Sequence, residues 1–111
     1  MESQPSDPIV VLMTAASVEE ATKIGDTLVR SQLAACVQVL PEMQSIYVWK
    51  GEVQREREVL LIAKSTRGNF EKLESQVRAT HSYETPEIVA LPIVAGSGPY
   101  LKWLAGSCEA S

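Results

Sequence analysis

Residues 52–63 read EVQREREVLLIA, an extended segment whose first half is charged and whose second half is wholly apolar. The apolar half, 59–63, is typical of a strand covered on both faces, whereas 52–58 is polar on both faces. Because a strand keeps its apolar positions in the core, only 59–63 can lie in the core of this domain, and 52–58 must project. An isolated two-stranded ribbon is marginally stable in water, so we expect another subunit to support the projecting half.

A tight turn and a partner strand precede this segment. Lys50-Gly51 suits a hairpin turn, because glycine supplies the positive φ that such turns need. The partner strand is predicted at 35–40 and again at 45–49, with a bend where Pro41 interrupts it. We interpret the charges of this hairpin as a salt-bridged surface made by Lys50, Arg55, Arg57, Glu52, Glu56 and Glu58.

The rest of the chain carries the patterns of two further strands and three helices. They are a central strand at 9–13, a helix at 17–32, a helix at 66–80, a strand at 88–94 and a short helix at 100–104. Ser17 and Glu20 have the spacing of a capping box at the start of the first helix. Pro92 cannot donate a hydrogen bond, which favours an edge position for the last strand. Asn69 is predicted to cap the second helix.

The order of these elements is β-α-β-β-α-β followed by a C-terminal helix, which predicts an α+β domain of the ferredoxin-like class with an extended central hairpin. Right-handed crossovers make the first and third strands central and the second and fourth strands edges. We expect residues 1–7 to form a flexible arm, 8–106 a single domain and 107–111 a tail.

Composition limits the classes of function. The chain has 111 residues, 10 basic and 14 acidic, so its net charge of −4 argues against a nucleic-acid-binding surface. Its apolar runs are too short to span a membrane, and its N-terminus lacks the features of a signal peptide. We therefore expect a cytoplasmic protein with no nucleic-acid or membrane partner. Its two cysteines, Cys36 and Cys108, are expected to be reduced thiols.

The segment after the second helix holds the densest set of potential metal donors. His81, the only histidine, is followed by Tyr83, Glu84 and Glu87, and Cys36 is the one thiol that could join them. Imidazole suits Cu(II), Zn(II) and Ni(II), and copper binds such donors most tightly. One histidine and one cysteine cannot close a tetrahedral zinc site, so a site here is weak, shared between subunits or completed by water.

Each of these residues also has a simpler interpretation. Glu84 and Glu87 are then solvated loop charges, His81 a packed residue at a helix end and Cys36 a small buried side chain. Two aromatic residues near the hairpin tip, Tyr47 and Trp49, are typical of an interface, although they could also line a ligand cleft. Lys64, at the end of its strand, could meet an anion in such a cleft.

Five segments of the sequence together resemble the CutA divalent-cation tolerance family. They are LAACV at 33–37, SIYVWKG at 45–51, HSYETPEI at 81–88, LPI at 91–93 and YLKWL at 100–104. The resemblance extends over about residues 9–105 and implies a tight homotrimer in which long hairpins extend the sheets of neighbours. It also implies kinship with the PII signalling trimers, whose ligands sit between subunits.

The resemblance carries expectations about metals. The family is described as binding copper and other divalent ions, and its histidine, tyrosine and two glutamates fall on His81, Tyr83, Glu84 and Glu87. This chain departs from the family at Ser82, where proline is usual, which predicts a less rigid loop. It also has Met13 where some members carry a thiol, and thioether is a weaker donor for Cu(II).

The function expected from the sequence is that of a homotrimeric binding or signalling module in the response to copper and other divalent cations, not an enzyme. It requires no cofactor, and Cu(II) or another divalent cation is bound weakly. The alternative is a PII-like trimeric sensor that binds a small anionic metabolite in a cleft between subunits.

Overall fold

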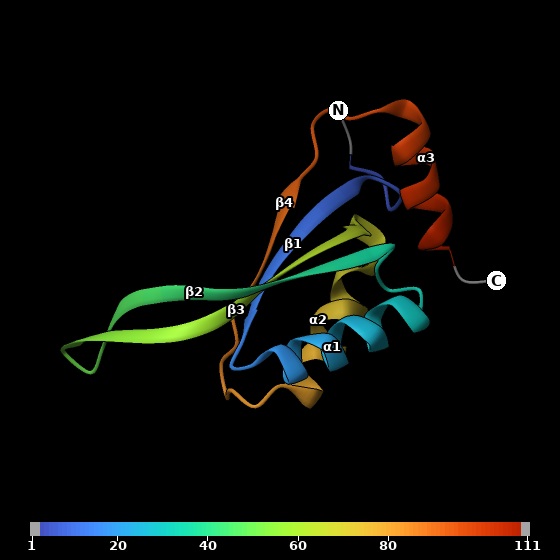
Figure 1. The fold of residues 1–111 in the computed structure, drawn as a ribbon. Coiled ribbons are helices and arrows are strands. Elements are labelled where there is room, and N and C mark those ends of the chain that lie inside the picture. The colour runs from blue at the N-terminus through green and yellow to red at the C-terminus, as the bar shows by residue number, and fades with distance from the viewer. Residues whose placement is uncertain (1–2, 110–111) are drawn as a thin grey trace.

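The computed structural model describes residues 3–109, which form a four-stranded antiparallel sheet and three α-helices (Figure 1). The elements are β1 (Pro8–Ala15), α1 (Val18–Arg30), β2 (Cys36–Trp49), β3 (Glu52–Thr66), a 3₁₀ turn η1 (Arg67–Asn69), α2 (Phe70–Thr80), β4 (Ile88–Pro92) and α3 (Gly98–Ser107). The sheet order is β2-β3-β1-β4, so the predicted central and edge strands are confirmed.

Two elements are shorter than predicted, each for a local reason. The first helix ends at Arg30, because Ser31 caps it and Gln32 adopts a left-handed φ of 61°. The last strand ends at Pro92, directly opposite Ile9, and does not continue to Val94. The Ile93 N–H still donates to the Pro8 carbonyl at 3.1 Å, but Pro8 has no N–H with which to return a bond, and the ladder ends there.

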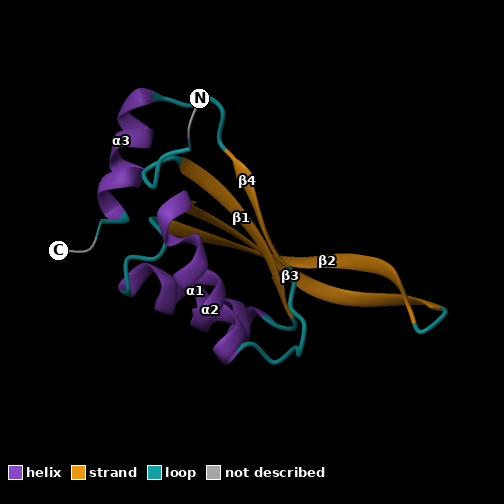
Figure 2. Cartoon of the chain, turned by 180° about the vertical axis from the view of Figure 1, so that it is seen from behind, coloured by secondary structure: helices purple, strands orange, loops and turns teal. Residues whose placement is uncertain are grey.

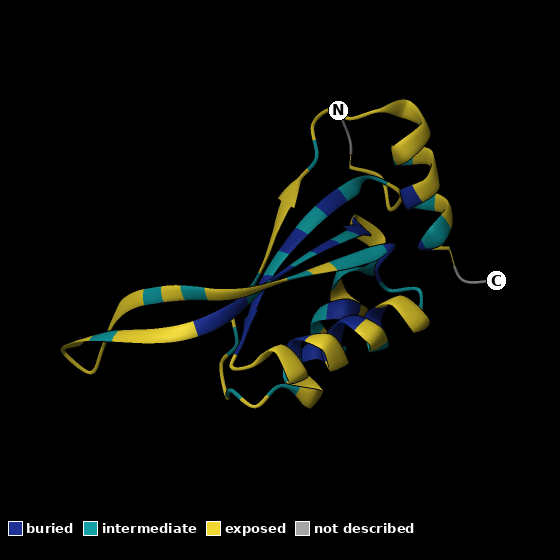
Figure 3. Ribbon diagram, viewed as in Figure 1, coloured by how far each residue is buried: buried dark blue, intermediate teal, exposed yellow. Residues whose placement is uncertain are grey.

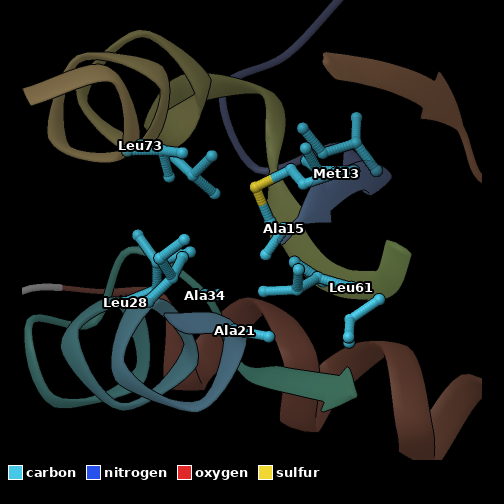
Figure 4. Packing of buried hydrophobic residues seen from close by; sticks show 13 residues of the cluster. Met13, Ala15, Ala21, Leu28, Ala34, Leu61 and Leu73 are labelled. Atoms are coloured by element: carbon cyan, nitrogen blue, oxygen red, sulfur yellow. The ribbon is translucent and has the colours of Figure 1, made fainter. Parts of the chain in front are cut away.

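Helices α1 and α2 cover one face of the sheet and enclose the core (Figure 2). Ser17 caps α1 as predicted, since its Oγ accepts a hydrogen bond from the Glu20 N–H at 3.1 Å. Alternate residues of the two central strands point into this layer and meet the apolar faces of both helices (Figure 4). The fully buried core includes Val11, Met13, Ala15, Ala21, Leu28, Leu61, Ala63 and Leu73.

The hairpin of β2 and β3 projects from the domain as an arm (Figure 1). Strand β1 pairs with β3 only from Val59 to Thr66, so Glu52–Glu58 pairs with β2 alone, as the charge pattern predicts. The turn residues Lys50 and Gly51 have φ values of 51° and 81°. The arm raises the radius of gyration to 14.7 Å, against about 13 Å for a compact chain of this length.

The predicted bend near Pro41 is a bulge inside one continuous strand. The pairing of β2 with β3 shifts register between Leu40 and Met43, and Glu42 has a φ of 65°. A bulge increases the local twist, and it lies where the arm leaves the sheet.

The arm and the edge strand β4 expose many large apolar residues. Figure 3 shows that most of the hairpin and β4 is exposed. The large apolar residues that are exposed on β2, β3 and β4 are Leu40, Ile46, Tyr47, Val48, Trp49, Val53, Val89 and Leu91. Exposed apolar side chains gathered on a projecting arm and on an edge strand are typical of an interface.

Both chain ends contact the domain. Within the expected flexible arm, the Pro5 and Asp7 carbonyls accept hydrogen bonds from the Gly68 and Arg67 N–H groups, each at 2.9 Å. In the expected tail, Cys108 is buried beside Leu104. Residues 1–2 and 110–111 of these two segments lie outside the described residues.

Asn69 stands at the N-cap position of α2, as the sequence predicts, but its side chain does not cap the helix. Its side chain makes no capping bond and instead donates from Nδ2 to the carbonyls of Gln32 at 3.1 Å and Cys108 at 3.0 Å. It thus joins the ends of α1 and α3 to the start of α2.

We expect Asn69→Ala to lower the free energy of unfolding by about 1–3 kcal/mol, because it leaves two part-buried carbonyls without their donor. Urea denaturation measures this loss. Asn69→Asp keeps the size of the side chain but cannot donate, and its carboxylate faces the same two carbonyl oxygens, so it should lose at least as much. A change below 0.5 kcal/mol in both variants would contradict the joining role of Asn69.

Candidate functional site

A cleft of about 610 Å³ lies between one face of the arm and the loop that joins α2 to β4. The arm contributes one wall and the loop contributes the other, so residues far apart in the sequence meet here. The cleft is lined by Thr14, Tyr47, Trp49, Gln54, Glu56, Glu58, Tyr83, Glu84, Thr85 and Glu87.

Tyr83 connects the two walls. Its hydroxyl donates a hydrogen bond to Glu58 Oε2 at 2.9 Å, and Glu58 is itself buried. Burial, and then the hydrogen bond to this carboxylate, raise the pKa of Tyr83 well above its ordinary value. The phenol therefore stays protonated at neutral pH, acting as a hydrogen-bond donor and not as a nucleophile.

His81 lies behind the cleft, with its side chain fully buried. Its Nε2 is 2.7 Å from the Thr14 carbonyl oxygen, which can only accept, so Nε2 carries the proton. Its Nδ1 accepts a hydrogen bond from the Tyr83 N–H at 2.9 Å. Both ring nitrogens are thus occupied, and the predicted role as a metal ligand requires the ring to leave these bonds.

Glu20 of α1 holds the start of the loop. Its carboxylate accepts hydrogen bonds from the Ser82 N–H at 2.8 Å, the Ser82 hydroxyl at 3.1 Å and the Ala16 N–H at 3.1 Å. Burial alone would raise the pKa of Glu20, but the bonds from Ala16 and Ser82 outweigh it and lower the pKa. The loop is therefore tethered at Ser82, where the sequence predicts a loss of rigidity.

The acid stability of the protein should depend on Glu20. Because its pKa is lower in the folded chain, its contribution to stability is present above the ordinary value of 4.5 and is lost as the pH falls through the folded pKa. When thermal unfolding is followed from pH 7 to pH 3, the melting temperature of Glu20→Gln should fall less than that of the wild type. Glu19→Gln, in the same helical turn, serves as the control and should follow the wild type. Equal drops in all three proteins would contradict this prediction.

Four carboxylates give the cleft its charge: Glu56, Glu58, Glu84 and Glu87. Hydrogen bonding to the Glu56 carboxylate, and then burial and the nearby negative charge, raise the pKa of the Tyr47 phenol. Within residues 3–109, no three His, Cys, Asp or Glu side chains converge closely enough to enclose a metal ion. A cation in this cleft would thus be held by a few oxygen atoms and by water or groups of another subunit.

The structure brings five of the eight predicted site residues together in the cleft. These are Tyr47, Trp49, Tyr83, Glu84 and Glu87. Cys36 and Lys64 are paired opposite each other elsewhere, about 13 Å along β3 from the position of Thr14. Cys36 Sγ lies 3.8 Å from the Tyr100 hydroxyl, and Lys64 donates to Gln38, so neither joins His81 in this subunit.

Two cleft residues, Glu56 and Glu58, were predicted to be part of a salt-bridged surface. The observed ion pair of this region joins Arg57 to Glu42 at 3.2 Å. Side chains alternate across a strand, so Gln54, Glu56 and Glu58 share one face, away from Arg57. That alternation is the signal in the sequence that could have identified them.

A second hollow of about 570 Å³ lies in the helical layer, between the end of α1 and α2. Its lining includes Gln32, Asn69, Lys72 and Cys108, and contains none of the predicted site residues. Its polar groups are mostly neutral, and Asn69 and Gln32 use theirs to join chain segments. The acidic cleft is therefore the stronger candidate site.

Comparison with known proteins finds one family. Residues 9–107 match the family model described as CutA1 divalent ion tolerance protein. The divalent-cation tolerance protein CutA of Thermus thermophilus is 50% identical over 95 residues, which are 86% of this chain and 92% of that protein. The chloroplastic protein CutA of Arabidopsis thaliana is 43% identical over 107 residues, and the match covers 96% of this chain but only 59% of that longer protein.

Solved structures agree with this result. The Thermus thermophilus divalent cation tolerance protein superposes with a TM-score of 0.90 at 47% identity, covering 92% of this chain and 99% of that one. CutA1 from Oryza sativa superposes with a TM-score of 0.91 at 38% identity, covering 95% and 96%. In the part of the chain that is described, no helix is long and apolar enough to cross a membrane.

Proposed function

The chain belongs to the CutA1 divalent ion tolerance protein family, and from this premise we propose that it is a homotrimeric module that binds divalent cations and is not an enzyme. The observation that carries the proposal is the gathering of Glu56, Glu58, Glu84 and Glu87 in one cleft. Clefts lined by charges of one sign concentrate counter-ions, and here the counter-ions are cations.

The donor atoms favour some cations over others. Carboxylate oxygens and water suit Mg²⁺, Ca²⁺ and Mn²⁺, whereas Cu(II) prefers imidazole. The only imidazole near the cleft is His81, and both of its nitrogens are hydrogen bonded. Oxygen donors alone therefore fit a hard divalent cation, bound weakly, and copper binding by nitrogen would require His81 to exchange partners.

Assembly into a trimer is supported by the arm and by the sheet edges. Residues Glu52–Glu58 of β3 pair only with β2. This half of the hairpin therefore has no other strand of its own sheet beside it. Both β2 and β4 have an unpaired edge that can accept a strand from another copy, and main-chain hydrogen bonds give such additions their affinity. The cleft residues Tyr47 and Trp49 lie on the arm, so assembly would also close the cleft.

The alternative ligand, a small anionic metabolite, is less well supported. Among the residues that line the cleft in this subunit there are four carboxylates and no lysine or arginine. An anion would have to receive its positive charge from another subunit. Cation binding needs no such addition and remains our proposal.

We expect Glu84→Gln/Glu87→Gln to weaken Mn²⁺ binding about tenfold or more, measured by isothermal titration calorimetry. A unit charge about 4 Å from another is worth on the order of 1 kcal/mol even in water, and two such charges are removed. The matched control, Glu19→Gln/Glu71→Gln, changes the net charge equally but lies outside the cleft. Equal affinities in the two variants would refute the proposal that the cleft holds the cation.

A further inference from the structure

The hydrogen bonds of Glu20 reach beyond its own helix. Ser17 already caps α1, so the helix does not need Glu20 in order to begin. Two of the three groups that donate to the Glu20 carboxylate belong to Ser82, which is 62 residues further along the chain. The Glu20 side chain is only 17% exposed, and it makes these bonds near the surface of the domain, where the loop passes the start of α1.

The loop held by Glu20 is continuous with one wall of the cleft. Ser82 lies between His81, which is anchored to Thr14 of β1, and Tyr83, whose N–H donates to the His81 ring. The Tyr83 hydroxyl then reaches Glu58 on the other wall. A path of hydrogen bonds thus runs from α1 through the loop to the arm, and Glu20 is at its start.

We infer that Glu20 is a positioning residue of the cleft, which fixes the loop at Ser82 and thereby sets the place of Tyr83 and of the carboxylates that follow it. Glu20 does not line the cleft and touches no ligand there. As far as it concerns cation binding, this inference rests on the proposed function. The fixing of the loop itself does not.

Amide hydrogen exchange followed by NMR tests the fixing of the loop without any cation. In Glu20→Ala, the Ser82 and Tyr83 amides should exchange at least tenfold faster than in the wild type, while the core amides of β3, such as Leu61, stay unchanged. Ser82→Ala keeps the N–H bond to Glu20 and should give a smaller acceleration. Glu19→Ala, the neighbour in the same turn, should behave as the wild type.

Calorimetry with Mn²⁺ on the same proteins tests the consequence for the cleft. The affinity of Glu20→Ala should fall at least threefold although every cleft carboxylate is present. Unchanged exchange at Ser82 and Tyr83 would overturn the inference, and so would faster exchange with unchanged Mn²⁺ affinity. If the wild type binds no Mn²⁺, the proposed function fails, and the exchange rates alone decide whether Glu20 positions the loop. If Glu20→Ala does not fold, Glu20→Gln takes its place; it keeps one acceptor oxygen, so exchange and affinity should change in the same direction but by less.

Discussion

His81→Ala should lower the free energy of unfolding by about 2–4 kcal/mol, measured by urea denaturation in the presence of a chelator. The imidazole is fully buried and satisfies two backbone groups, the Thr14 carbonyl and the Tyr83 N–H. Alanine leaves both groups unpaired and opens a cavity behind the cleft. The loss is expected with no metal present, because the ring makes these bonds within the chain.

This result would separate two roles for the histidine. A residue that serves only as a metal ligand would leave the stability of the metal-free protein unchanged and affect only binding. The ring also has a direct signature, since ¹⁵N NMR should find the proton on Nε2 and an accepting lone pair on Nδ1. An unshifted denaturation midpoint, or a proton on Nδ1, would contradict the structural role. The matched control is Thr80→Ala, at the end of the same helix, which removes only hydrogen bonds within α2.

Most of the fold could be predicted because the sequence pattern has a single physical solution. The change from charged to apolar residues at Val59 gave the length of the arm, and β1 does begin to pair there. Pro92 predicted an edge strand, because a strand that lies between two other strands needs the backbone N–H that proline lacks. Such features are local, and each depends on the chemistry of one or two residues.

The contacts that were not predicted join residues far apart in the chain. Asn69 has the sequence context of a helix cap, but two carbonyls at 32 and 108 compete successfully for its amide. Ser82 has the context of a free loop, but a carboxylate 62 residues away accepts both of its donors. Propensity describes what a residue does within its own segment, and it does not include partners that tertiary packing supplies.

The candidate site divides in the same way. Tyr83, Glu84 and Glu87 are close in sequence, and the structure keeps them in one cleft. Cys36 and Lys64 were grouped with them by residue type alone, and the sheet register sets them apart. Glu56 and Glu58 were assigned to ion pairs, although strand alternation places them on the face away from Arg57; what the sequence does not reveal is that the loop after α2 folds over that face of the arm.

If the chain assembles as we propose, Trp49→Ala should weaken the trimer more than any other single change on the surface. The indole is 60% exposed in the single chain and lies at the end of the arm, where the next pair along, Val48 and Val53, is exposed on the opposite face of the ribbon. Tryptophan is prominent among the residues that dominate interfaces, and truncating such a residue costs about 2 kcal/mol or more. That is about a 30-fold loss of affinity for each contact between subunits, and the loss is repeated at every such contact in the proposed trimer.

Sedimentation equilibrium over a range of protein concentrations distinguishes this effect from a loss of folding. Because Trp49 is exposed and lies outside the core, the variant should keep its circular dichroism spectrum while it dissociates at concentrations where the wild type remains assembled. Val29→Ala is the control, since Val29 is an exposed apolar residue of α1, on the layer away from the arm. If Trp49→Ala stays assembled as Val29→Ala does, the arm is not the main contact. The apolar edge of β4 would then have to supply the interface, and the cleft would not depend on a second subunit for its closure.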